Sequence, residues 1–178
     1  MALTGEGGLP RVQRSSALFC RVAGTFYRGV NPQFATSALE GSVRPGRYSA
    51  EGQPTLYLSS SPEGVSAAML AHHHDADPEL ELLRIRVEAD GIFDLRDEHA
   101  RSAAGIRLED AVSDWQQVVA EGGIPPSWTV RHRLMKLGAQ GLIDPSRKAP
   151  GLWHLVLFRW DRDQDASAPQ VHVIPAAD

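Results

Sequence analysis

FYRGVNPQ at residues 26–33 and GSVRPGRYSAEGQPTLYLSSSPEGVSAAM at residues 41–69 are the two stretches that say most about the architecture of this chain. Within the second stretch, residues 54–59 (PTLYLS) are rich in apolar and aromatic types. This run lies between Gly52 and Pro62, two residues that commonly bound a strand. The pattern therefore predicts a short, partly buried strand.

A helix is expected directly after this strand. Ser61 stands at the N-cap position and Pro62 at the first helical position, which predicts a helix over residues 61–74. Further strands are predicted at residues 17–22, 25–28, 80–87, 141–144, 152–160 and 171–174, and further helices at 108–121 and 126–137. We expect Ser127 to cap the last helix and Gly138 to end it. Strands and helices mix without a regular βαβ period, so the order favours the α+β class.

Length and composition indicate one ordinary globular domain. The chain has 178 residues, 42% of them hydrophobic, and we expect a single domain over residues 1–178 with peripheral ends at 1–15 and 163–178. Its 18 Lys and Arg against 22 Asp and Glu give a net charge of −4, which argues against a general nucleic-acid or anionic-membrane binder. No apolar run has the length of a signal peptide or a membrane span, so we expect a cytoplasmic protein.

Several chemistries are disfavoured by the residues present. Cys20 is the single cysteine, which excludes a disulfide scaffold and a cysteine-based zinc site, and we interpret it as a small buried hydrophobe. The histidines at 72–74 with Asp75 form a dense cluster, but adjacent helix positions point about 100° apart, so no metal site is expected. Neither GxxxxGK[ST] nor GxSxG occurs, which disfavours a P-loop and a nucleophile elbow.

Two arginines stand beside tyrosines in the opening stretches. Arg28 follows Tyr27, and Arg47 precedes Tyr48, with Tyr57 ten residues after Arg47. A guanidinium pairs with phosphate oxygens, and a tyrosine ring can stack on a heterocycle while its hydroxyl binds a ribose. The residues therefore suit a dinucleotide, although arginine beside tyrosine in a strand is more often a plain surface ladder.

The order of several short motifs resembles the RES-domain family, the toxin half of Xre–RES toxin–antitoxin pairs, and within it the ParT-type branch most closely. The motifs are YR at 27–28, GRYSAEG at 46–52, PTLYLSSSPEGVSAA at 54–68 and QGLIDPSRKAPGLWHLVLFRW at 140–160. The resemblance covers roughly residues 26–160. It implies a fold like the ADP-ribosyltransferases, with two packed, mostly antiparallel sheets, flanking helices and a cleft for NAD.

The resemblance also implies an activity and a set of residues. NAD is the expected co-substrate, without a metal, and its nicotinamide–ribose bond is the one that breaks. The resemblance assigns catalysis to Arg28, Tyr57, Glu51 and Ser146, and NAD contacts to Arg28, Arg47, Tyr48, Ser49, Tyr57, Ser146 and Arg147. For Ser146, a turn after Pro145 is the alternative interpretation. The expected partners are a Xre or ParS-type antitoxin that covers the face with Arg28 and Arg47, and a cellular protein target.

One position departs from the family pattern. The helix after YLSSSPE should carry a glutamate, yet Ala68 and Met69 stand there. Glu51 and Glu63 are the candidate substitutes. Glu51 is favoured, because the helix dipole alone explains an acidic residue such as Glu63 in the first turn of a helix. Loss of the carboxylate should slow hydrolysis of NAD, which favours transfer of ADP-ribose to a protein. Degradation of NAD by water or phosphate, and a binding role without catalysis, remain the alternatives.

Overall fold

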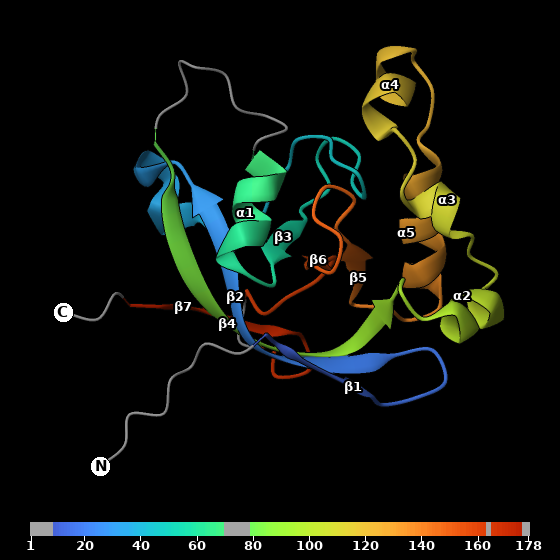
Figure 1. Ribbon diagram of the computed structural model, residues 1–178, viewed down its shortest axis with the longest axis horizontal. Helices are drawn as coiled ribbons and strands as arrows, with labels where there is room; N and C mark the ends of the chain where they lie inside the picture. Colours follow the sequence, from blue (N-terminus) through green and yellow to red (C-terminus); the bar gives the residue numbers. More distant parts are fainter. Residues whose placement is uncertain (1–8, 70–78, 163–164, 176–178) are drawn as a thin grey trace.

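A computed structural model describes residues 9–69, 79–162 and 165–175 (Figure 1). The strands are β1 (Arg11–Arg14), β2 (Cys20–Val30), β3 (Leu56–Ser59), β4 (Glu81–Asp94), β5 (Gly141–Pro145), β6 (Trp153–Leu157) and β7 (Gln170–Ile174). The helices are α1 (Pro62–Met69), α2 (Glu98–Ala104), α3 (Leu108–Ala111), α4 (Trp115–Ala120) and α5 (Pro126–Lys136), with a 3-10 helix at Pro32–Ser37. This mixture of strands and helices confirms the α+β class.

All these strands belong to one hydrogen-bonded sheet rather than to two separate ones. Its order is β1-β2-β3-β6-β5-β4-β7, and β2 also pairs with β4, so the five strands from β2 to β4 in this order, both included, close into a ring. The long strand β4 makes this possible, because residues 81–89 pair with β2 and residues 92–94 pair with β5. Gly91 lies between these two parts at φ +68°, a conformation that favours glycine and lets the strand turn from one partner to the other.

The pairing of β2 is very uneven. It runs alongside β4 over ten residue pairs, but its only register pair with β3 is Tyr27 opposite Ser59. The two strands therefore diverge on either side of this pair. Side chains from β2 can reach the backbone of β3 where the ladder is missing.

The helices cover the sheet unequally (Figure 1). Helices α2 to α5 gather on one side of the molecule, whereas α1 lies against β2 and β3. Leu142 and Val156 of the sheet are buried with Val130 and Leu134 of α5 in a core on the helix side. A second core, which includes Phe26 and Trp153 in edge-to-face contact, lies on the other face.

Three expectations for the helices need correction or remain untested. The predicted helix at 108–121 is two short helices, because Asp114 caps α4 by accepting from the Gln117 N–H at 3.3 Å. Ser127 does not cap α5, which begins at Pro126; its hydroxyl instead donates to the Arg47 carbonyl. Residues 72–75 lie outside the described part of the chain.

Other local expectations are confirmed. The Ser61 hydroxyl accepts from the Gly64 N–H at 3.1 Å at the start of α1, and Gly138, at φ +96°, follows the end of α5. Cys20 is buried in β2. Within the described residues, no helix combines the length and the apolar character that crossing a bilayer requires.

Candidate active site

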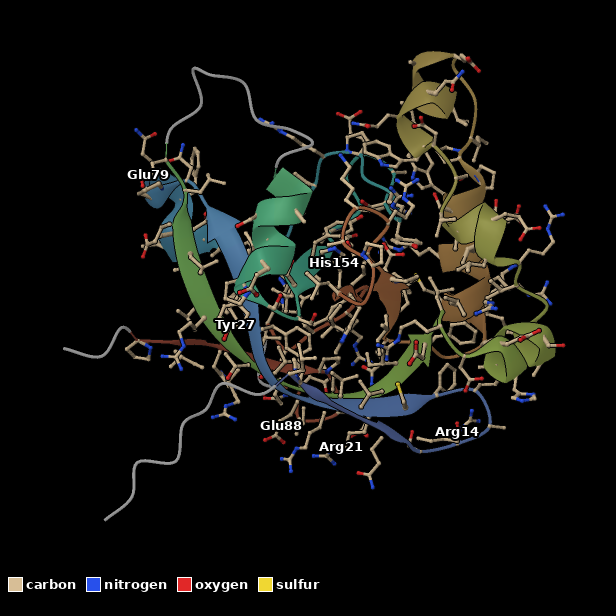
Figure 2. The ribbon with its side chains drawn as sticks, viewed as in Figure 1. Arg14, Arg21, Tyr27, Glu79, Glu88 and His154 are labelled. Carbon is tan, nitrogen blue, oxygen red and sulfur yellow. The ribbon has the colours of Figure 1, made fainter. Side chains whose placement is uncertain are left out.

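A row of polar side chains crosses four strands on the helix-covered face of the sheet. Ser59 on β3 lies directly opposite His154 on β6, and His154 lies opposite Asp144 on β5. Tyr27 on β2 extends the row, since it lies opposite Ser59. Directly opposite residues of an antiparallel pair share one face, with their Cβ atoms about 5 Å apart. Figure 2 shows His154 in the interior, beside β3 and β6.

The neighbouring row on the same face is apolar. Tyr57, Val156 and Leu142 stand two residues away along β3, β6 and β5, and they pack in the core formed with α5. The face therefore changes from apolar to polar between these two rows. Polar groups gathered there must find partners within the protein or in a ligand.

Tyr57 connects the split between β2 and β3 to the loop before β3. Its carbonyl accepts a hydrogen bond from Arg28 Nη1 at 3.1 Å. Its hydroxyl accepts from the Tyr48 N–H at 3.2 Å and lies 3.1 Å from the Ser49 hydroxyl. Burial lowers the pKa of Arg28 and raises that of Tyr57. Four of the predicted site residues thus belong to one hydrogen-bond network.

Asp144 joins this network from β5. Its Oδ1 accepts from the Tyr48 hydroxyl at 2.8 Å, and its Oδ2 lies 3.9 Å from Arg47 Nε. Burial raises the pKa of Asp144 to about 6, and the Tyr48 hydrogen bond and the Arg47 charge oppose that rise only in part. The pKa of Tyr48, which is completely buried, is raised well above its usual value by burial and then by Asp144. Near neutral pH, Asp144 is therefore mostly an ionised, largely buried carboxylate.

Helix α5 holds the loop that carries Arg47 and Tyr48. Three consecutive carbonyls, those of residues 46–48, accept hydrogen bonds from side chains of this helix. Trp128 Nε1 donates to the first at 2.8 Å, the Ser127 hydroxyl to the second, and Arg131 Nη1 to the third at 2.9 Å. A loop bound at every residue is fixed in position, so its two site residues are held in place before any ligand arrives.

Two predicted arginines meet at the turn between α3 and α4. Arg47 Nη1 donates to the Ser113 carbonyl at 3.0 Å, and Arg147 Nη1 donates to the Val112 carbonyl at 2.7 Å. These carbonyls are adjacent along the chain, although the arginines come from loops a hundred residues apart. Two guanidinium groups directed at neighbouring acceptors form a local concentration of positive charge.

His154 is neutral near neutral pH and bonds to Ser59. Its Nδ1 lies 2.9 Å from the Ser59 hydroxyl, and burial, aided by the charge of Arg47, lowers its pKa. Asp144 bonds to Tyr48 instead of to this imidazole. The row therefore lacks the serine–histidine–carboxylate relay of a hydrolase.

The remaining predicted residues lie apart from the network. Glu51 is exposed in the turn before β3, and Glu63 is exposed in the first turn of α1. The Ser146 hydroxyl accepts from the Ala149 N–H at 3.1 Å, which agrees with a turn after β5. Ala68 lies in α1, as the motif predicts. Among the described residues, no group of three or more His, Cys, Asp or Glu could hold a metal ion.

Sequence reasoning missed Asp144, His154 and Arg131. Asp144 and His154 each interrupt a strand that is otherwise apolar, which is the signal that could have drawn attention to them. Arg131 stands on the buried side of α5, where a charged residue is unusual. Its guanidinium also lies over the Phe158 ring at 4.9 Å.

Two buried nitrogens in and around the network have no hydrogen-bond partner in the described part of the chain. They are Arg28 Nε and Arg131 Nε. Buried donors are almost always satisfied in proteins, because an unsatisfied one costs about 1–3 kcal/mol. The Arg28 nitrogen, at the split between β2 and β3, is thus suited to an acceptor that a ligand supplies.

Comparisons with known proteins agree with this fold. The family model described as RES domain matches residues 18–176. A chain in the crystal structure of the M. tuberculosis MbcT–MbcA toxin–antitoxin complex superposes with a TM-score of 0.55 at 18% sequence identity, over 85% of this chain and 84% of that one. At this identity the likeness establishes a shared fold. A sequence comparison with curated proteins finds no match.

Proposed function

Because the chain belongs to the RES domain family, we propose that it is the toxin of a bacterial toxin–antitoxin pair that uses NAD. In this proposal it cleaves the nicotinamide–ribose bond and transfers ADP-ribose to a cellular protein, which halts growth. The enzyme is then a mono-ADP-ribosyltransferase of the cytoplasm. NAD is its co-substrate.

The arrangement of the arginines is the observation that carries this proposal. Arg28 offers a buried Nε without a partner, and Arg47 and Arg147 meet at neighbouring carbonyls. A pyrophosphate has several acceptor oxygens and two negative charges, so it suits guanidinium groups on fixed supports. The half-buried Tyr57 is the ring we assign to the nicotinamide, because Tyr48 is completely buried.

The reaction that we propose needs little covalent help from the protein. When the bond breaks, its electron pair leaves with nicotinamide, which becomes neutral, and the ribose carries the positive charge. A nucleophile of the target protein then bonds to the ribose carbon and releases its proton to solvent. The site has to hold the two halves of NAD and stabilise the developing cation.

Degradation of NAD is the second candidate, and one observation favours it. Transfer is expected over hydrolysis because the family glutamate is missing at Ala68. Asp144 nevertheless gives the site an ionised carboxylate close to Arg47. A carboxylate that stabilises the ribosyl cation helps attack by water or phosphate as much as attack by a protein side chain.

The proposal includes a neighbouring antitoxin. The likeness to a chain of the MbcT–MbcA complex supports a protein partner of this kind. We assign its contact to the face that carries Arg28 and Arg47, because a toxin that consumes NAD has to be blocked in the cell that makes it.

Labelled NAD tests the proposed function. We would incubate the purified chain with NAD labelled in its adenylate part, with and without a cell lysate, and follow both NAD and protein-bound label. Transfer predicts turnover only with lysate and label on a protein band. Label that appears only as free ADP-ribose or its phosphorylated form would establish degradation instead. No turnover in either condition would contradict the enzymatic proposal and leave a binding role.

A further inference from the structure

We propose that Asp144 takes the place of the missing family glutamate as the carboxylate that contacts the ribose of NAD. This inference rests on the proposed use of NAD, but it does not depend on which acceptor receives the ADP-ribose. Asp144 comes from β5, whereas the family position belongs to α1, which carries Ala68 there. A carboxylate on a different element would thus supply the same negative charge.

The geometry leaves one oxygen of Asp144 available. Oδ1 accepts the Tyr48 hydrogen bond, which fixes the orientation of the carboxylate. Oδ2 accepts no hydrogen bond from any residue that the structure describes, and its nearest cation is Arg47 Nε at 3.9 Å. The Asp144 side chain keeps 13% of its surface exposed, so it is not sealed off from solvent. A ribose hydroxyl is a donor that suits this oxygen.

The supports of Asp144 are rigid on both sides. Tyr48 is completely buried, and Arg131 of α5 binds its carbonyl. Ile143 before Asp144 is completely buried in the sheet. Electrostatic stabilisation of a transition state depends on groups that are already oriented before the reaction, because reorientation during the reaction would cost free energy.

Glu51 and Glu63 lack these supports. Both are exposed, and neither makes a hydrogen bond or ion pair through its carboxylate with the described residues. Water screens an exposed carboxylate, whereas the low dielectric around a buried one strengthens its attraction to a nearby cation. Asp144 is therefore the better placed of the three to stabilise positive charge on the ribose.

The role involves no proton transfer to Asp144. As the bond between ribose and nicotinamide breaks, its electron pair leaves with nicotinamide. Asp144 stays ionised, attracts the ribosyl cation and accepts a hydrogen bond from a ribose hydroxyl. The charge of Arg47, whose Nε lies at 3.9 Å, favours the ionised carboxylate, and its Nη2, which makes no hydrogen bond with the described residues, is left to bind the pyrophosphate.

The test compares Asp144→Asn with Glu51→Gln in the NAD assay of the full chain. Asparagine keeps the shape and the acceptor for Tyr48 but loses the charge. We expect kcat of Asp144→Asn to fall by at least about 100-fold with little change in KM for NAD, as for other electrostatic groups. Glu51→Gln, at the candidate that the resemblance favours, should lower kcat far less than Asp144→Asn does. Asp110→Asn, which changes a partly exposed carboxylate of α3 that pairs with Arg107, is the matched control and should keep its kcat.

The outcomes separate this inference from the proposed function. Full activity of Asp144→Asn in an active background would overturn the role of Asp144 alone. A rise in KM with unchanged kcat would also overturn it, because the residue would then only position Arg47. A wild-type chain that consumes no NAD would overturn the proposed function, and this role of Asp144 with it.

A pH profile of the wild-type chain tests the same role without any substitution at Asp144. Activity should fall as the pH drops below about 6, where the carboxylate takes up a proton. His154 on the adjacent strand, with Arg47, Tyr48 and Tyr57, completes the charged and titratable groups around it. His154→Gln should still lose activity at acidic pH as the wild type does. If this loss at acidic pH disappears in His154→Gln, the assignment of the titrating group to Asp144 is contradicted.

Discussion

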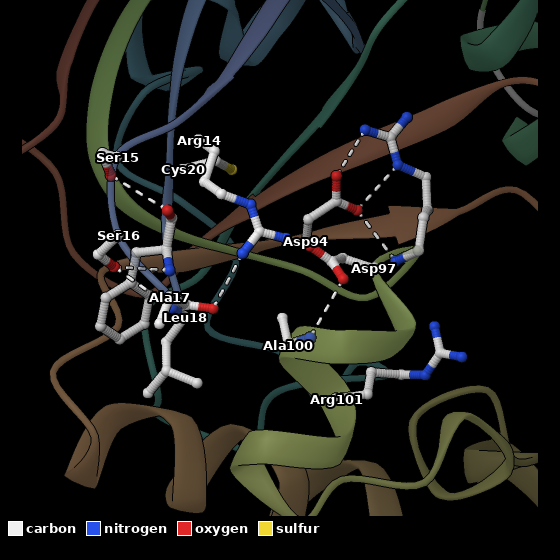
Figure 3. Close-up of polar contacts among 12 residues, drawn as sticks. Arg14, Ser15, Ser16, Ala17, Leu18, Cys20, Asp94, Asp97, Ala100 and Arg101 are labelled. Carbon is white, nitrogen blue, oxygen red and sulfur yellow. Dashed lines mark hydrogen bonds and ion pairs between the residues drawn. The ribbon is translucent and has the colours of Figure 1, made fainter.

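The candidate active site and the hollow beneath the β1–β2 hairpin differ in how completely their charged side chains are paired. The hollow is a small cavity of about 90 Å³ between the hairpin and the start of α2 (Figure 3). Arg14 there forms an ion pair with Asp97, and Arg96 pairs with Asp94 at 2.8 Å. Burial raises the pKa of Cys20, which also lines the hollow, to about 12, so its thiol is inert. Each of these groups has its partner within the protein.

At the candidate site the charged groups are buried and incompletely paired. Among the described residues, Arg28 Nε, Arg131 Nε and Asp144 Oδ2 have no hydrogen-bond partner. Such groups lower the stability of the folded chain unless a ligand completes them. We therefore assign the proposed ligand to the region of the unsatisfied buried groups around Arg28 and Asp144, and not to the hollow.

Removal of Arg131 should have the largest effect. Its Nη1 binds the Tyr48 carbonyl at 2.9 Å and the Thr55 hydroxyl at 2.6 Å. Arg131→Met would leave these buried acceptors without a donor, and we expect the free energy of unfolding to fall by about 4 kcal/mol. Urea denaturation measures it. The control is Arg101→Met near the hollow, which removes a single hydrogen bond to the Leu95 carbonyl and should lower the free energy of unfolding clearly less. Equal losses of unfolding free energy in the two variants would remove the contrast between the regions.

Arg47→Ala should abolish most activity while the fold persists. Its side chain is 16% exposed, and its guanidinium carries positive charge at the proposed pyrophosphate position. We expect kcat/KM for NAD to fall by about 100- to 1000-fold, as when a charge-stabilising donor is removed, and toxicity to disappear with it. Arg14→Ala changes an arginine of the other region and should leave turnover unchanged. Toxicity that survives in a folded Arg47→Ala variant would show that the site is assigned wrongly.

Asp144→Asn should make the chain more stable at neutral pH. Burial raises the pKa of Asp144 from its ordinary 3.8 to about 6, so between these values the folded chain binds more protons than the unfolded chain. The contribution of Asp144 to stability is thus greatest below pH 3.8 and is lost as the pH rises through about 6. Two pKa units correspond to about 3 kcal/mol. We expect the variant to exceed the wild type by up to about this amount near pH 7.5 in urea denaturation, and to match it near pH 4.

A gain in stability together with a loss of activity would indicate a functional carboxylate. A residue kept for structural reasons would lose both when it is replaced. Equal stability of Asp144→Asn and wild type at both pH values would remove the proposed cost of the ionised carboxylate, and with it one difference between the two regions.

Local sequence patterns predicted most of the secondary structure. Apolar and aromatic runs marked β3 and β6, and Gly138 marked the end of α5. The break at Asp114 was missed because the apolar spacing of residues 108–121 continues through it, and only the side-chain cap shows that a new helix begins. The single closed sheet could not be foreseen, since it depends on how β4 divides between β2 and β5.

The candidate site was predictable mainly where its residues stand in short motifs that combine arginine and tyrosine, as at Arg28 and at residues 47–57. Arg47, Tyr48, Ser49 and Tyr57 lie within eleven residues, and the structure joins them in one network. Asp144 reaches the same network from 96 residues away. Such a contact depends on how the loop that carries Tyr48 packs against β5, which no local sequence pattern encodes. The supporting role of α5 was hidden for the same reason.

Arg14→Gln should have the smallest effect. The Arg14 side chain is 55% exposed, and exposed ion pairs gain little because water screens them and ordering two long side chains costs entropy. Asp97 also keeps its bond from the Ala100 N–H at 3.1 Å, so α2 stays capped without the arginine. We expect the denaturation midpoint of Arg14→Gln to match that of the wild type within error at physiological salt. A clear loss of stability would mean that paired charges around the hollow contribute as much as buried ones, and the contrast between the two regions would then fail.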